Sequence, residues 1–332
     1  MPTALVTGAT GLVGSHIVER LLADGWTVRA LVRSPSNEVT SLGAETMRGD
    51  VLDRDSFVRS AGGCDAIFHT AAAITTSGGW DVYHRLNVDG AGNAIAAAES
   101  SGARLLQLSS VAVYGPAGRY SAPGKKTDED TALGPLPERA YYARSKRESE
   151  ALVLEAHAAG RIWATAVRPN VIYGRRDRQF VPRMARLLRR GFVPLIGGGR
   201  AIFSVTHAAN VADGAVRAVG CDVAGGRAYN LANDYEVTVR RFFELAGDGL
   251  GIRVRFVPIP LPVAKVAFKM VKSTARALAG GRFNVISNAS LGMLTKDNPF
   301  TSERARRELG WSPTVRPEQG VPEAFRWWMT HR

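Results

Sequence analysis

The chain has few cysteines, no long apolar run and no leader-like start. Cys64 and Cys221 are its two cysteines, too few for a disulfide framework and without the spacing of a metal site. No apolar run reaches the roughly 20 residues of a membrane-spanning helix, because Lys265 and Lys269 interrupt the best candidate, residues 259–271. No basic and then apolar segment precedes the first apolar stretch, so a secretory signal is not expected. These absences predict a cytoplasmic protein with no metal site and no spanning segment.

The charge balance is strongly basic, with a net charge of +13 over 332 residues. A basic surface can bind nucleic acid, anionic lipid or a polyanionic cofactor. The arginines are scattered along the chain, and aromatic residues do not alternate with them as a base-stacking surface requires. We therefore expect a small-molecule substrate and no nucleic-acid partner.

The first half of the sequence alternates short apolar runs with segments of helical periodicity. Hydrophobic residues make up 45% of the chain, and the 35 glycines fall in short clusters that suit tight turns. This alternation predicts an α/β fold with a parallel, doubly wound sheet of the Rossmann type. The expected strands are residues 4–6, 27–32, 45–48, 66–68, 105–108 and 164–167, and the expected helices are residues 13–24, 88–100 and 141–158.

The alternation loosens after Arg168, which predicts a second, less regular region. We expect residues 1–170 to form the dinucleotide-binding domain, with a returning segment near residues 203–235. Residues 171–332 are expected to form mainly a smaller C-terminal α+β lobe that binds the substrate over the carboxyl ends of the strands, the edge at which open α/β sheets bind ligands. Residues 229–231 are expected to add one more strand to the main sheet.

A glycine-rich turn, residues 7–14, joins the first expected strand to the first helix. Glycines at this spacing permit a tight turn, close approach of a pyrophosphate to backbone amides, and close packing of helix on strand. The helix N-terminus then presents unpaired N–H groups to the phosphates. A plain glycine-rich turn is the alternative, and the strand and helix on either side argue against it. The residues expected to bind the dinucleotide here are Gly8, Thr10, Gly11, Leu12, Val13 and Gly14.

The end of the second strand selects the dinucleotide. An acidic residue there would bind the ribose 2′-hydroxyl of NAD, whereas this chain has Arg33, which favours the 2′-phosphate of NADP. NADP is therefore the preferred cofactor and NAD the possible one; a solvated Arg33 is the alternative. Asp50 and Val51 are expected to meet the adenine. Small residues after the fourth strand are expected to let backbone lie against the cofactor, namely Thr70, Ala71 and Ala72.

Tyr142 and Lys146 lie four residues apart and so share one face of a helix. The ammonium favours the phenolate electrostatically, so Tyr142 can exchange a proton with a carbonyl or alcohol oxygen. Ser110, just after the fifth strand, can bond the same oxygen, and Leu108 and Ser109 are expected beside the cofactor. A tyrosine and lysine at this spacing are often a surface pair, but the glycine turn and the strand-end serine together favour a catalytic site.

With these motifs the chain resembles the extended short-chain dehydrogenases/reductases, the NAD-dependent epimerase/dehydratase superfamily, over nearly its whole length. The matching segments are residues 7–14, 49–51, 69–72, 87–90, 109–115, 142–146 and 168–174. The resemblance implies that Ser110, Tyr142 and Lys146 are catalytic. It also implies a homodimer, and a nicotinamide pocket lined by Arg168, Pro169, Asn170 and Val171.

Departures from the family patterns narrow the branch. Sugar dehydratases usually have an acidic pair after the active-site Ser or Thr, whereas Val111 and Ala112 stand here. Nucleotide-sugar epimerases usually have an arginine that binds the diphosphate where this chain has Phe203. The C-terminal region is similar to the 3β-hydroxysteroid dehydrogenase-like branch. We expect an NADP(H)-dependent carbonyl reductase or alcohol dehydrogenase with a fairly apolar substrate. The alternatives are a nucleotide-sugar 4-epimerase that retains NAD and, more remotely, a non-catalytic dinucleotide-sensing protein.

A basic stripe marks the amphipathic segment at residues 263–278. Lys265, Lys269, Lys272 and Arg276 recur at helical spacing, with apolar residues on the other faces. Such a helix suits peripheral membrane contact or a lid over an apolar substrate. An ordinary solvated helix face is the more common alternative.

Overall fold

A seven-stranded parallel sheet dominates the computed structural model, which describes residues 1–74, 78–116, 125–264, 266 and 288–331. The strand order is β10-β6-β5-β4-β1-β2-β3, and the order reverses between β1 and β4. Such a reversal opens a crevice at the carboxyl ends of the strands, where α/β sheets bind ligands. The strands are β1 (Thr3–Thr7), β2 (Thr27–Val32), β3 (Glu45–Arg48), β4 (Ala66–His69), β5 (Arg104–Leu108), β6 (Ala164–Pro169) and β10 (Ala228–Leu231).

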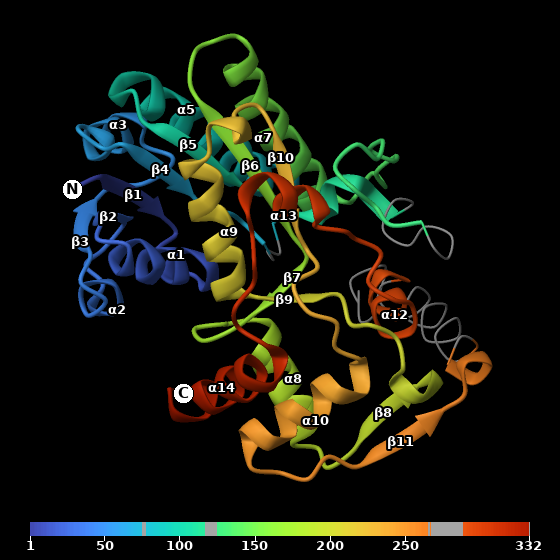
Figure 1. Cartoon of the computed structure of the whole chain (residues 1–332). Helices are drawn as coiled ribbons and strands as arrows, with labels where there is room; N and C mark the ends of the chain where they lie inside the picture. Colours follow the sequence, from blue (N-terminus) through green and yellow to red (C-terminus); the bar gives the residue numbers. More distant parts are fainter. Residues whose placement is uncertain (75–77, 117–124, 265, 267–287, 332) are drawn as a thin grey trace.

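Helices cover both faces of this sheet (Figure 1). On one face α1 and α9 pack together, and Ile17 and Val211 belong to their shared apolar core. On the other face α3, α5 and α7 enclose a second core that includes Phe57, Ile95 and Val153. The helices of this half are α1 (Leu12–Ala23), α2 (Asn37–Thr40), α3 (Arg54–Ala61), α5 (Gly90–Ser101), α7 (Tyr141–Ala158) and α9 (Ala208–Gly220).

The C-terminal lobe lies beyond the carboxyl ends of the strands (Figure 1). Two short parallel pairs, β7 with β9 and β8 with β11, replace a continuous sheet there. Its core is rich in phenylalanine, and α8, α10 and α14 pack around it. Its elements are β7 (Val171–Tyr173), α8 (Phe180–Leu188), β8 (Val193–Ile196), β9 (Val205–His207), α10 (Val239–Leu250), β11 (Phe256–Ile259), α12 (Asn288–Thr295) and α14 (Pro317–Thr330). The helix α13 (Glu303–Leu309) returns to the sheet half, where it packs against β10 and α9.

The structure confirms the predicted fold class, the six predicted strands and the helix at residues 141–158. Residues 229–231 do join the main sheet, because β10 pairs with β6. The helix predicted at residues 88–100 starts earlier, with α4 (Trp80–Tyr83) and a π-helical turn, η1 (His84–Asp89). That turn shifts the helical register, so the segment lacks a clean 3.6-residue period. α3 was not predicted from the sequence.

Two sequence-level expectations concern membranes. Of the helices in the described ranges, none combines the length and apolarity needed to cross a bilayer. The amphipathic segment at residues 263–278 lies almost wholly outside the described residues.

Candidate active site

The glycine turn between β1 and α1 is shaped by contacts that exclude side chains. Gly8 has a φ of +67°, and a Cβ there would lie 2.9 Å from the backbone nitrogen of Ala71. Gly11 donates its N–H to the carbonyl of Gly8 at 2.8 Å. A Cβ on Gly14 would overlap that same carbonyl oxygen. Gly8 and Gly14 are therefore required by the geometry of the turn.

The N-terminus of α1 begins at this turn. Thr10 lies in the turn, and Leu12 and Val13 open the helix. Gly11 provides no side-chain cap, and the first helical turn has no acidic residue. Unpaired N–H groups at such a terminus form a ready anion site, so the turn fits a pyrophosphate.

The exit of β4 is fastened to the same turn. The Thr70 hydroxyl donates to the carbonyl of Thr7 at 2.6 Å, and the N–H groups of Thr70 and Ala71 donate to the Thr7 hydroxyl, each at 3.2 Å. This clamp places Thr70 and Ala71 beside the glycine turn. Their small side chains leave the backbone accessible at the reversal of strand order.

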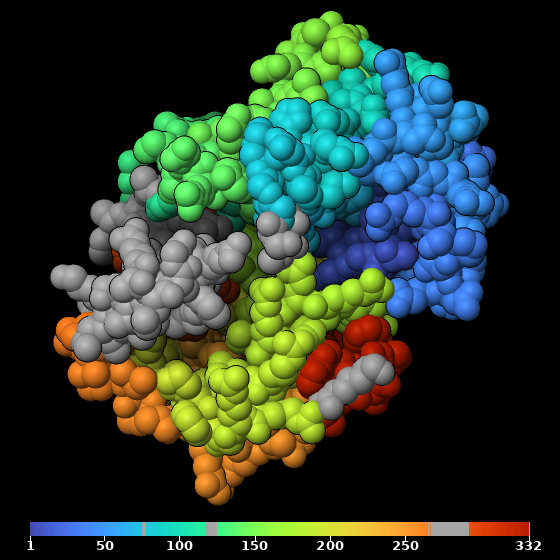
Figure 2. Space-filling view, turned by 180° about the vertical axis from the view of Figure 1, so that it is seen from behind, coloured from blue at the N-terminus to red at the C-terminus, as the bar shows by residue number. Residues whose placement is uncertain are grey.

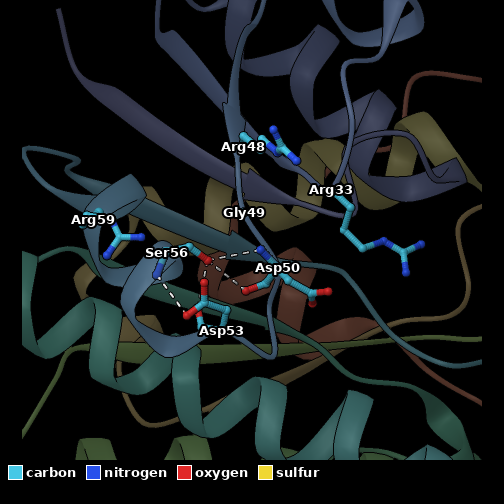
Figure 3. Close-up of a pocket in the computed structure, with 7 residues that line it drawn as sticks. All are labelled: Arg33, Arg48, Gly49, Asp50, Asp53, Ser56 and Arg59. Atoms are coloured by element: carbon cyan, nitrogen blue, oxygen red, sulfur yellow. Dashed lines mark hydrogen bonds between the residues drawn. The ribbon is translucent and has the colours of Figure 1, made fainter.

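A basic cavity of about 410 Å³ lies at the ends of β2 and β3 (Figure 3). Arg33 and Asp50, both predicted from the sequence, are in it; Arg48 and Arg59 were not predicted. Within the described part of the chain, Arg33, Arg48 and Arg59 form no ion pair, although most other arginines of the sheet half do. The lining residues are Arg33, Arg48, Gly49, Asp50, Asp53, Ser56 and Arg59.

The hydroxyl of Ser56 organises the floor of this cavity. It accepts the N–H of Asp50 at 3.2 Å and donates to the carbonyl of Asp53 at 3.0 Å (Figure 3). Asp50 in turn accepts the N–H of Leu52 at 3.0 Å. The Asp53 carboxylate accepts the N–H of Ser56 at 3.4 Å. Both carboxylates are thus held in local turns, and the three arginines outnumber them in the lining of the cavity.

The helix α7 carries Tyr142 and Lys146 one turn apart, as predicted. Lys146 is 2% exposed, and its Nζ donates to the carbonyl of Leu108, at the end of β5, at 2.7 Å. Burial lowers the pKa of Lys146 to about 8, and the charge of Glu150 opposes that shift. An ammonium can donate three hydrogen bonds, so this buried cation keeps donor capacity for a ligand. Tyr142 is half-buried on the same helix.

Ser109 and Ser110 follow β5 directly. The Ser110 hydroxyl accepts the N–H of Ala112 at 3.2 Å, which leaves its own proton to donate to a ligand oxygen. The Ser109 hydroxyl is buried and has no hydrogen-bond partner in the described part of the chain. Both serines therefore keep unused donors at the carboxyl edge of the sheet.

Asn87 is a positioning residue that the sequence analysis did not select. Its side chain accepts the N–H of Ala73 at 2.7 Å and donates to the carbonyl of Ala73 at 3.1 Å and to the Ser145 hydroxyl at 2.8 Å. Ser145 in turn donates to the carbonyl of Tyr142 at 3.0 Å. Asn87 thus ties the segment after β4 to the helix of the predicted catalytic pair. Its place in the motif at residues 87–90 was a visible signal.

The side chain of Arg168 is committed to structure. It donates to Glu150 on α7 (Nε to Oε2, 2.9 Å) and to the Tyr114 hydroxyl at 2.8 Å. Tyr114 donates onward to Asn230 on β10 at 2.9 Å. This network holds α7 against β6 and β10, so the predicted lining of the nicotinamide by Arg168 can involve only its backbone.

The residues that follow Arg168 lead from the sheet into the lobe. Pro169 ends β6 and Val171 begins β7. Between them, the amide of Asn170 donates to the carbonyl of Ala232 at 2.7 Å and accepts from Thr206 at 2.8 Å. Phe203, where an epimerase would have an arginine, is 2% exposed and packs on Phe242 with ring centres 5.0 Å apart.

This geometry defines a class: a Rossmann-type dinucleotide-binding enzyme with a tyrosine–lysine pair at the carboxyl edge of its sheet. Residues 4–232 match the family described as the NAD dependent epimerase/dehydratase family. The chain belongs to that family and is an NAD(P)-dependent oxidoreductase of the extended short-chain dehydrogenase/reductase type.

Curated relatives and a solved structure agree with this assignment. The chain is 33% identical to the 4-hydroxy-2-methyl-3-oxo-4-farnesyl-3,4-dihydroquinoline-1-oxide ketoreductase of Stigmatella aurantiaca, over 95% of this chain and 93% of that one. It is 29% identical to the 2-alkyl-3-oxoalkanoate reductase of Stenotrophomonas maltophilia, over 96% of each. The crystal structure of gox2253 superposes with a TM-score of 0.77 at 26% identity, covering 100% of this chain and 99% of that one.

Proposed function

We propose that the protein is an NADP(H)-dependent carbonyl reductase, or alcohol dehydrogenase in reverse, for a fairly apolar ketone or secondary alcohol. The observation that carries this proposal is the buried Lys146 cation, one helical turn from Tyr142 and hydrogen-bonded at the end of β5. In an ordinary surface pair both side chains would be solvated, because burying an ammonium costs free energy.

The residues of the glycine turn would hold the dinucleotide. The open N-terminus of α1 suits the pyrophosphate, and we expect the backbone of residues 70–72 and 168–171 to lie against the rest of the dinucleotide. When bound, the nicotinamide supplies the hydride. The two free donors of Lys146 suit its ribose hydroxyls, because a desolvated ammonium gains from each additional acceptor.

Proton transfer would be the task of the chain itself. The Tyr142 hydroxyl donates a proton to the substrate oxygen during reduction and takes it back during oxidation. The Lys146 charge stabilises the phenolate that remains. Ser110 donates a second hydrogen bond to the same oxygen, because its hydroxyl proton is not used by the turn it caps. Asn87 fixes α7 relative to the segment that follows β4.

The preference for NADP is supported by the arginine cavity. Arg33, Arg48 and Arg59 bring three unpaired guanidinium groups to the place where a 2′-phosphate would lie, after the second strand. Guanidinium binds phosphate with charge-assisted, often bidentate hydrogen bonds. NAD has no phosphate at this position and would leave the three guanidinium groups without that partner.

The apolar-ketone proposal is supported by the lobe and by the relatives. Buried Phe203 cannot neutralise the diphosphate of a nucleotide sugar. The two relatives' names specify 3-oxo compounds that carry a farnesyl or alkyl group. We infer that the lobe at residues 171–332 binds a related ketone over the strand ends.

The chain is further proposed to be a cytoplasmic homodimer. Light scattering, which measures the molar mass in solution, would test the dimer.

A spectroscopic screen tests this function. NADPH oxidation would be followed by its near-ultraviolet absorbance with simple ketones, steroids, β-keto acids and nucleotide sugars. We expect turnover with an apolar ketone and NADPH, and none with nucleotide sugars. Interconversion of a nucleotide sugar without net change in absorbance, with NAD retained on the purified protein, would instead favour the epimerase. Dinucleotide binding without any turnover would favour the sensing protein.

A further inference from the structure

The net positive charge of the chain comes from two stretches that contain no acidic residue. Residues 178–212 carry six arginines, and residues 249–296 carry eight lysines and arginines. Of the 43 basic and 30 acidic residues, the rest of the chain therefore holds 29 and 30, which nearly cancel. Lysines and arginines occur throughout the chain, whereas Asp and Glu are missing from these two stretches.

The structure brings these two stretches together. β8 from the first pairs in parallel with β11 from the second, with Pro194 opposite Val257. The N–H of Val193 donates to the carbonyl of Arg255 at 2.8 Å, which continues the pairing towards Phe192. Figure 2 shows the first stretch, in yellow-green, and residues 249–264 of the second, in orange, on one face of the molecule.

The exposed side of β8 and β11 mixes cations with apolar groups. Exposure alternates along β11 and the residues just before it. Arg253, Arg255 and Val257 lie on the solvent side, while Val254 and Phe256 turn inward. Across from them Phe192 is 56% exposed, and Val257 itself is 46% exposed. Both side chains therefore present apolar surface to solvent beside the arginines.

The helix α8 extends this face. Val181, Ala185 and Leu188 point into the aromatic core of the lobe. Arg186, Arg189 and Arg190 lie on the outer side and are exposed. The basic face is defined here as Arg186, Arg189, Arg190, Phe192, Arg253, Arg255 and Val257.

The arginines of the basic face have no partner in the chain. Among the described residues, none of the five forms an ion pair or a side-chain hydrogen bond. On neighbouring α10, by contrast, Arg240 and Arg241 both lie within 4 Å of Glu244. The basic face therefore carries uncompensated charge around an exposed phenylalanine and valine.

We propose that the basic face docks the enzyme on the surface of an anionic lipid bilayer. The cations suit lipid phosphates and carboxylates, and Phe192 and Val257 suit insertion into the interface between headgroups and acyl chains. A nucleic acid would use the cations and could stack a base on Phe192, but it offers nothing to Val257, and no row of aromatic residues accompanies the arginines. This docking surface lies outside the proposed cofactor site and does not depend on the proposed reaction.

Sedimentation with vesicles tests the proposal. The full-length protein is mixed with vesicles of phosphatidylcholine alone or with a third of phosphatidylglycerol, and the bound fraction gives a partition coefficient. We expect binding to the anionic vesicles only, weakening with added salt. The triple variant Arg189→Gln, Arg253→Gln, Arg255→Gln should bind on the order of a hundredfold less, since each cation near an anionic surface contributes roughly fivefold.

A matched control separates the basic face from the net charge. Arg54→Gln, Arg85→Gln, Arg326→Gln removes three exposed arginines elsewhere and should leave vesicle binding within about twofold of the wild type. Equal losses in the two triple variants would show that diffuse charge drives binding and would overturn the proposal. So would equal binding to neutral vesicles, or no binding to either kind.

A second variant separates lipid from nucleic acid. Phe192→Ser should lower vesicle binding roughly tenfold, because a partly inserted phenylalanine loses its apolar burial. It should leave the retention of a duplex DNA probe unchanged. Tighter binding to that DNA than to anionic vesicles, lost in the first triple variant, would assign the face to nucleic acid instead. Thermal unfolding of every variant is compared with the wild type to confirm folding.

Discussion

The sheet half and the C-terminal lobe are built on different principles. In the sheet half, small residues and backbone hydrogen bonds fix the geometry: glycines shape the turn after β1, and Thr7 fastens it to β4. In the lobe, large aromatic rings pack around Phe242, which contacts Phe203, Phe180 and Phe325. Hydrogen bonds and close backbone contacts thus fix the turn of the sheet half, whereas aromatic packing fills the core of the lobe.

The difference suggests a division of labour. The groups proposed for chemistry, Lys146 and Tyr142, belong to a helix of the sheet half. The lobe contributes shape and, at its outer side, unpaired cations. Changes at Tyr142 or Arg33 should therefore alter chemistry or cofactor choice with little loss of stability. Changes in the lobe should alter stability or substrate range and leave the dinucleotide site intact.

The largest expected effect is the loss of turnover in Tyr142→Phe. Removing a general acid lowers the rate by about a hundredfold to ten-thousandfold. The dissociation constant of NADPH, measured by fluorescence titration, should stay within about threefold of the wild type. Tyr141→Phe is the matched control, because its i+4 residue is Ser145. Turnover of Tyr142→Phe at the rate of that control would remove Tyr142 from the mechanism.

Phe242→Ala should be the most destabilising change in the lobe. Truncating a fully buried phenylalanine costs about 3–5 kcal/mol of unfolding free energy, and Phe242 is 0% exposed. Chemical denaturation measures that loss. Phe192→Ala, at an exposed position, should cost far less. If NADPH affinity of the folded Phe242→Ala protein fell as steeply as its stability, the two halves would not be as separate as the comparison holds.

Arg33→Ala should change cofactor choice. Loss of charge-assisted hydrogen bonds to a 2′-phosphate should weaken NADPH binding roughly tenfold to a hundredfold, with NADH binding nearly unchanged. Arg54→Ala provides a control at an exposed arginine that does not line the cavity. Titrations with NADPH and NADH give the two dissociation constants. An equal rise in both for Arg33→Ala would contradict the proposed preference for NADP.

The pH dependence of the sheet half follows from Lys146. Burial lowers its pKa to about 8, so kcat/KM for reduction should fall, up to about tenfold per pH unit, as the ammonium is lost above that pH. Stability should move the opposite way. The unfolded lysine keeps its proton up to about pH 10.4, so the unfolded state binds more protons between these values and stability from this group rises with pH. Activity and unfolding are measured over the same range. If Lys146 were an ordinary surface lysine with an unshifted pKa, neither quantity would change through this group below about pH 10.

The sequence predicted the sheet half well because its signals are local. Alternating apolar runs, a glycine turn and a tyrosine four residues before a lysine each follow from spacing along the chain. Arg48, Arg59 and Asn87 escaped prediction because their roles arise only when separate segments meet. The pairing of β8 with β11 joins residues about sixty apart, and no local period announces it. The lobe's aromatic core is likewise visible only after folding.

Following the hydride itself gives the most direct test of the proposed reaction. NADPH that carries deuterium at the transferable position of the nicotinamide is supplied together with the best ketone from the screen. The mass of the alcohol product is then measured by mass spectrometry. A carbonyl reductase places one deuterium on the carbinol carbon for each NADPH oxidised. Product without deuterium, or label that stays with a retained cofactor while a sugar is epimerised, would contradict the proposed function.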